Sequence, residues 1–158
     1  GQIPNTSFYK NVHRFSNLIE RDDVLVIRFD AQLYFANISY FKESLTLITN
    51  QKGANLKLIV LNAEGIPDLD SSAMNMLKDL VTEYRKEGIM FWFSNVIGPV
   101  RDIMYRGNLT NQVGEEYFFV GVQNAVDYYE ENKENEFQKY TMQTNVPEAD
   151  PGRNRKFE

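Results

Sequence analysis

Two aspartates and two serines stand close together in the middle of the chain, and they are the side chains best placed to do chemistry. Asp68, Asp70, Ser71 and Ser72 directly precede a run with helical periodicity. The free amide groups at a helix N-terminus favour negative charge. A serine there is a candidate phosphoacceptor, because a phosphoryl group adds about −1.5 to −2 charges near neutral pH. Helix capping explains the same residues, and on physical grounds alone it is the more frequent use of serine and aspartate at such a position.

The acids of this loop have more than one interpretation. Together with Glu64, Asp68 and Asp70 could bind a divalent cation or repel a competing anion. A solvated loop that ends in a helix cap is the more frequent explanation of such residues. A phosphorylated receiver domain is a weaker alternative, because the first firm strand offers Asp30 alone and residues 117–123 contain no lysine.

Motifs for other chemistry are missing from the sequence. Neither a G-x-x-x-x-G-K-[ST] nor a G-x-G-x-x-G nucleotide loop occurs, and there is no cysteine. The single histidine, His13, has no nucleophile or metal ligand near it in the sequence. We therefore expect no catalytic residue, no cofactor and no metal site.

A strand, a loop and a helix must position the Asp-Ser-Ser segment. Residues 56–62 are an apolar run that predicts a buried strand, and the helix that follows the loop begins after Asp70 as its cap and ends at Gly88. Its apolar face consists of Ala73, Leu77, Leu80, Val81 and Tyr84.

Strand and helix patterns alternate along the rest of the chain. Apolar runs predict strands at residues 24–30, 56–62, 89–95 and 115–120, and helical patterns begin near Asn37, Asp70, Pro99 and Gly121. This alternation favours a largely parallel sheet with right-handed crossovers. Phe8, Lys10 and Val12 predict a short edge strand, and residues 33–35 predict an extension of the first strand after a turn or bulge.

Length and composition set further limits. A chain of 158 residues forms one domain more readily than two. Its formal net charge of −5, without a long basic run, argues against nucleic acid and against an anionic membrane surface as partners. No apolar segment approaches the roughly 20 residues that span a bilayer. We expect this polypeptide to be soluble by itself, and its start at Gly1 fits a fragment of a longer protein.

Three segments in this order resemble a STAS domain: VLVIRFDAQLYFANISYFKESL, LKLIVLNAEGIPDLDSSAMNML and GIMFWFSNVIGPVRDIM. The Leu-Tyr-Phe-Ala-Asn segment at residues 33–37 makes the resemblance closest to the cytoplasmic C-terminal domain of bacterial SulP-type anion transporters. Residues 1–17 also resemble the segment that follows the last membrane helix in such proteins. The resemblance covers roughly residues 1–130.

The resemblance implies an α/β fold. The expected architecture is a single STAS-type domain over residues 1–135, with a mixed, mostly parallel β-sheet, an antiparallel N-terminal edge strand and about four helices. Residues 136–158 are expected to form a flexible C-terminal tail, because helical periodicity stops near Phe137.

The implied function is non-catalytic regulation of an anion transporter at the cytoplasmic face of the inner membrane. The expected partners are the membrane domain of the same transporter, a cytoplasmic protein or kinase, and a second copy in a dimeric transporter. Asp68, Asp70 and Ser71 are the expected interaction loop.

Two alternatives remain open. Soluble STAS relatives are phosphorylated on a serine in an Asp-Ser-Ser-Gly segment, and Ser72 matches that phosphoacceptor, although Ala73 replaces the glycine. The chain could therefore be a freestanding phospho-switch that antagonises an anti-sigma factor. It could also bind a small anion or nucleotide at the helix entrance, where free amides hold oxyanions.

Overall fold

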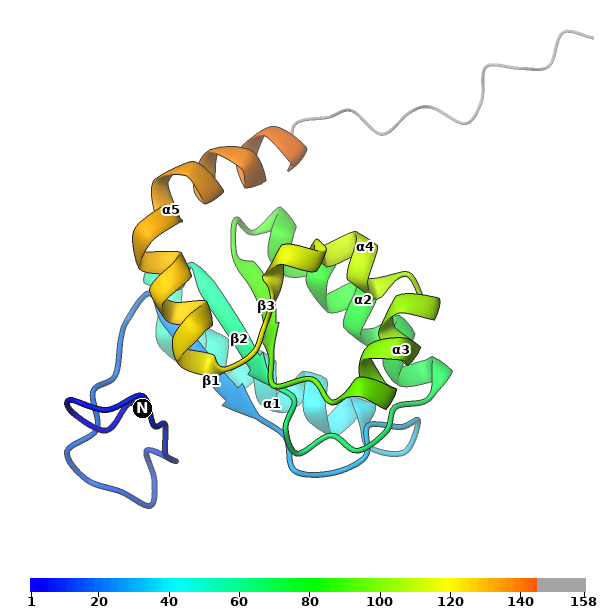
Figure 1. Cartoon of the computed structure of the whole chain (residues 1–158), viewed down its shortest axis with the longest axis horizontal. Coiled ribbons are helices and arrows are strands. Elements are labelled where there is room, and N and C mark those ends of the chain that lie inside the picture. Colours follow the sequence, from blue (N-terminus) through cyan, green and yellow to red (C-terminus); the bar gives the residue numbers. More distant parts are fainter. Residues whose placement is uncertain (145–158) are drawn as a thin grey trace, which may run out of the picture.

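This computed structural model describes residues 1–144, which contain four β-strands and five α-helices (Figure 1). In chain order, with two short 3₁₀ turns, the elements are β1 (Val24–Arg28), α1 (Ile38–Lys52), η1 (Gly53–Asn55), β2 (Leu58–Asn62), α2 (Ser71–Lys86), β3 (Met90–Ser94), α3 (Gly98–Arg106), α4 (Leu109–Val113), η2 (Glu115–Tyr117), β4 (Phe118–Phe119) and α5 (Val122–Thr144).

The four strands form one parallel sheet in the order β1-β2-β3-β4. Each crossover moves to the next strand in the same direction, so right-handed connections place α1 to α4 on one face. Figure 1 shows α5 alone on the other side. Aromatic contacts agree, because Phe91 of β3 stacks on Tyr84 of α2 while its neighbour Trp92 contacts Tyr129 of α5.

The core lies between these two layers of helices. All five residues of β3 are buried, as are the first four of β2, which explains why both strands read as continuous apolar runs. Every residue of the predicted apolar face of α2 is buried. The parallel α/β arrangement and this helix phase are therefore confirmed.

The predicted antiparallel edge strand at the N-terminus is wrong, because the four-stranded sheet is parallel throughout residues 1–144. The first nineteen residues close on themselves instead. Gln2 and Ile19 exchange backbone hydrogen bonds of 2.9 and 2.8 Å, and Asn5 and Asn17 turn the chain with positive φ angles. This internal closure leaves Phe8 exposed, whereas an edge strand would have turned it toward the core.

The helices also differ from the expected four. Leu109–Val113 forms an additional short helix, α4. Helix α5 continues to Thr144, past the predicted domain end at residue 135. Glu136 is 1% exposed and accepts a hydrogen bond from the hydroxyl of Tyr117 in η2, which joins this part of α5 to the body; it also accepts one from Tyr128 within α5. Residues 145–158 lie outside the described part of the chain.

None of the helices within residues 1–144 is both long enough and apolar enough to cross a membrane.

Candidate functional site

Asp70 organises the start of α2 with both oxygens of its carboxylate. Its Oδ1 accepts a hydrogen bond of 2.8 Å from the amide of Ala73, and its Oδ2 accepts one of 3.0 Å from the amide of Phe35. These amide hydrogen bonds, that of Ala73 first, lower the pKa of Asp70 below its usual value. The prediction that Asp70 caps this helix is confirmed.

The loop that contains Phe35 is fixed to the same helix start. The amide of Leu33 donates to the carbonyl of Asp68 at 3.0 Å, and the amide of Asp70 donates to the carbonyl of Leu33 at 3.1 Å. Leu33 therefore pairs with Leu69 in a single parallel bridge, with its side chain fully buried. It does not extend β1, which ends at Arg28.

Asn37 shapes the turn that presents Phe35. Its Oδ1 accepts from the amide of Tyr34 at 3.0 Å, and its Nδ2 donates to the carbonyl of Gln32 at 2.8 Å. The ring of Phe35 is 71% exposed and meets the ring of Tyr34 edge to face, with centroids 5.6 Å apart. A large apolar side chain is thus held in solvent by a hydrogen-bonded turn.

The two serines that follow Asp70 open α2. Ser71 and Ser72 are the first and second residues of the helix; Ser71 is exposed and Ser72 half-buried. Within residues 1–144, neither hydroxyl forms a hydrogen bond. Both hydroxyls are therefore available for contact or modification from outside. We call residues 31–37 and 63–72 together the α2 entrance.

Negative charge surrounds the α2 entrance. Residues 29–37 and 62–70 contain four carboxylates and no lysine or arginine. Arg28, at the end of β1, pairs with Asp30 at 2.5 Å and with Glu64 at 2.6 Å. The absence of a side chain at Gly65 lets the loop after β2 lie close to the end of β1, because a Cβ atom at residue 65 would lie 2.8 Å from the carbonyl oxygen of Phe29. Such exposed ion pairs add little stability, and the main effect of Arg28 is to offset part of the negative charge of Asp30 and Glu64.

This arrangement disfavours two of the chemistries considered from the sequence. Asp68 Oδ1 accepts from the amide of Leu69 at 2.8 Å, and among the described residues no three histidine, cysteine, aspartate or glutamate side chains group as metal ligands. An anion at the helix N-terminus would compete with the Asp70 carboxylate for the amide of Ala73.

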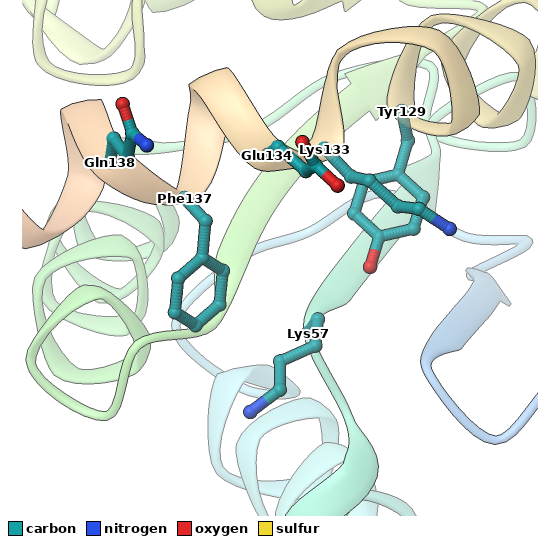
Figure 2. A pocket seen from close by; sticks show the side chains of 6 residues that line it. All are labelled: Lys57, Tyr129, Lys133, Glu134, Phe137 and Gln138. Carbon is teal, nitrogen blue, oxygen red and sulfur yellow. The ribbon is translucent and has the colours of Figure 1, made fainter.

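A separate hollow lies away from the α2 entrance (Figure 2). Its volume is about 470 Å³, and it lies between α5 and the residue that precedes β2. The ammonium of Lys57 lies 5.4 Å from the centroid of the Phe137 ring. The lining residues are Lys57, Tyr129, Lys133, Glu134, Phe137 and Gln138. None of the predicted site residues takes part, so this hollow is not the site indicated by the sequence.

The sequence-based interpretation missed Phe35 as part of the site. It assigned residues 33–35 to a strand, which would have buried alternate side chains. The available signal was Asn37, a helix-cap residue only two positions after Phe35, which leaves too little chain for a strand to end.

The fold and this entrance define a small parallel α/β domain with a rigid, solvent-facing helix start and no grouping of metal ligands in its described residues. Residues 16–126 match the STAS domain family, and the chain belongs to that family.

Named relatives of the chain are sulfate transporters. It is 33% identical over 135 residues to the probable sulfate transporter 4.2 of Arabidopsis thaliana, covering 80% of this chain and 20% of the relative. It is 26% identical over 129 residues to a probable sulfate transporter of Mycobacterium tuberculosis, covering 82% of this chain and 23% of the relative. The chain therefore spans about a fifth of the length of the curated relatives that it matches.

Solved structures share the fold. The murine Slc26a9 anion transporter in its inward-facing state superposes with a TM-score of 0.76 at 22% identity, over 83% of this chain and 21% of that one. The STAS domain of a SulP transporter from Vibrio cholerae superposes with a TM-score of 0.60 at 18% identity, over 78% of this chain and 91% of that one. At these identities the likeness concerns the fold.

Proposed function

We propose that this chain is the non-catalytic regulatory and interaction domain of a SulP-type anion transporter at the cytoplasmic face of the membrane. The 33% identity to a sulfate transporter, over a segment that forms a fifth of that protein, supports this assignment. The expected partners are the membrane domain of the same transporter and, in a dimeric transporter, a second copy of the chain.

The α2 entrance is the contact site in this proposal. One observation supports it above others: Phe35 is 71% exposed while its amide is hydrogen-bonded to Asp70 at the helix start. Protein interfaces are centred on aromatic side chains that need little ordering on binding, inside a polar rim. Phe35 supplies such a centre, and Asp68, Asp70 and Ser71 supply the rim. A partner that fits has an apolar pocket bordered by basic side chains.

Cross-linking in the full-length transporter tests the contact. The chain contains no cysteine, so Ala36→Cys in an otherwise cysteine-free transporter places a single thiol beside Phe35. We expect that thiol to cross-link to the membrane domain or to the second copy. We expect Phe35→Ser to lower the yield by about tenfold or more, as for a central interface residue.

Leu47→Ser is the matched control, since Leu47 is 62% exposed but lies on α1, away from the site. A cross-link from Ala36→Cys that Phe35→Ser leaves unchanged would contradict the proposal.

Phosphorylation of Ser72 is the second candidate function. It is favoured by the position of this residue in the first turn of α2 with an unbonded hydroxyl. Incubation with the cognate kinase, ATP and magnesium should label the wild type and leave Ser72→Ala unlabelled. A wild type that stays unlabelled would exclude the phospho-switch without affecting the cross-linking result.

A further inference from the structure

The first nineteen residues form a lobe with several exposed apolar side chains. We call residues 1–19 the N-terminal lobe. Phe8 is 66% exposed and Phe15 is 49% exposed, and Val12 and Ile19 are exposed as well. Residues 1–15 lie outside the segment that matches the STAS family. Residues 16–19 lie within that segment, so the match to the family covers only the end of the lobe.

The charge of the lobe is opposite to that of the rest of the chain. It contains Lys10 and Arg14 and no acidic residue before Glu20, so the net charge of −5 arises wholly from the residues that follow it. The ammonium of Lys10 lies 5.7 Å from the centroid of the Phe15 ring. Basic and aromatic groups are thus intermixed on the same short segment.

The lobe holds its shape without using these side chains. Its ends are joined by the backbone bonds between Gln2 and Ile19, and the amide of Lys10 donates to the carbonyl of Gly1 at 2.9 Å. Gln123 of α5 holds the lobe to the body by accepting from Gln2 Nε2 at 2.8 Å and from the hydroxyl of Tyr9 at 3.1 Å. The apolar side chains are therefore left free for an external surface.

We propose that the N-terminal lobe binds the surface of a membrane that contains anionic lipids. Phe8 and Phe15 enter the boundary between headgroups and acyl chains, and Lys10 and Arg14 face the lipid phosphates. Aromatic side chains flanked by basic ones suit this boundary, and each lysine or arginine near an anionic leaflet strengthens binding by roughly fivefold. The acidic α2 entrance is repelled by the same leaflet, so the lobe is the surface that faces the lipid.

A protein partner is less well matched to this lobe. A protein interface buries a contiguous apolar centre, whereas Phe8, Val12, Phe15 and Ile19 are spread over a segment with basic residues between them. The lipid assignment rests on exposure and charge alone. It does not depend on the contact proposed at the α2 entrance.

Two single-cysteine variants of the 158-residue chain test the assignment. Ser7→Cys places a solvent-sensitive fluorophore beside Phe8, and Ala36→Cys places the same fluorophore beside Phe35; both positions are exposed, and neither change removes an aromatic side chain. With vesicles of phosphatidylcholine and phosphatidylglycerol, the emission at position 7 should shift to the blue and that at position 36 should not. Vesicles of phosphatidylcholine alone, or high salt, should abolish the shift.

Charge reversal separates local from total charge. Lys10→Glu with Arg14→Glu should weaken vesicle binding by at least roughly 25-fold, because two favourable contacts are lost. The control pair Lys86→Glu with Arg106→Glu changes the net charge by the same amount at exposed sites in the last turns of α2 and α3. We expect the variant with this control pair to bind anionic vesicles with an affinity close to that of the wild type.

Four results would overturn the proposal. The first three are a wild type that does not bind anionic vesicles, equal losses of binding in both charge-reversed pairs, and equal emission shifts at positions 7 and 36. The fourth is a protein contact, in which Ser7→Cys cross-links to the transporter's membrane domain while the chain does not bind vesicles. Cross-linking from Ala36→Cys tests the contact at the α2 entrance independently of all four.

Discussion

The N-terminal lobe and the α2 entrance each expose a phenylalanine, but the charges around the two rings are opposite. Phe8 lies in a segment with Lys10 and Arg14 and no acid, whereas Phe35 lies among loops with four carboxylates, two of which pair with Arg28. The net charge of the whole chain, −5, argued against an anionic membrane as a partner. The comparison shows that the distribution of charge, rather than its sum, decides which partner each surface can meet.

The two regions also differ in how they are attached. The α2 entrance is joined to the core by the buried side chain of Leu33 and by the helix whose face fills the interior. The lobe bonds mainly to itself and reaches α5 through Gln123. We therefore expect the entrance to unfold with the whole domain and the lobe to open on its own.

The largest expected effect tests the attachment of the entrance. Leu77 is fully buried on α2, so Leu77→Ala should lower the free energy of unfolding by roughly 2–5 kcal/mol in a denaturant titration. Leu47→Ala on exposed α1 surface should change it by less than about 0.5 kcal/mol. Equal losses from the two changes would contradict the assigned phase of α2.

The attachment of the lobe is tested at Gln123. Gln123→Leu removes the acceptor for Gln2 and Tyr9, at a cost of about 1 kcal/mol per hydrogen bond lost. Amide hydrogen exchange at Gln2 and Ile19 should become roughly thirtyfold faster, while the amides of α2 stay as protected as in the wild type. Faster exchange in both regions would show that the lobe and the body open together.

A smaller effect concerns the charge of the Asp70 cap. Its folded-state pKa is lowered by the amides of Ala73 and Phe35, so its stabilisation is complete above the unfolded value of 3.8 and is lost as pH falls through the lower folded value. Asp70→Asn should lower Tm at neutral pH, and the difference should shrink as the pH falls below 3.8. A difference in Tm that stays constant down to the lowest pH would show that the charge is not what stabilises the cap.

The smallest expected effect on stability comes from Ser72→Asp. The new carboxylate gains from the helix N-terminus about what it loses to Asp68 and Asp70, and no core volume changes. The free energy of unfolding should change by less than about 0.5 kcal/mol, while cross-linking from Ala36→Cys changes. A large fall in Tm would show instead that the half-buried Ser72 is structurally required.

How far prediction succeeded depended on the range of the interactions. Helix α2, its cap at Asp70 and strands β2 and β3 were predicted because their patterns are local and because a strand covered on both faces is apolar throughout. The prediction of an edge strand in the N-terminal segment was wrong, because the pattern of Phe8, Lys10 and Val12 is too short to distinguish a strand from a turn-rich loop. Helix α5 continues to Thr144, whereas its predicted end was near Glu136, because the apolar periodicity that marks a helix in the sequence stops near Phe137.

At the site, the sequence alone determined the residue types and their order: a capping aspartate, two serines behind it and acids in the preceding loop. It did so because capping and helical periodicity act within a few residues. Only the tertiary structure decided that Phe35 lies beside Asp70, thirty-five positions apart in the chain. Contacts between residues so far apart in the sequence depend on how the whole chain folds, and no local sequence pattern indicates them.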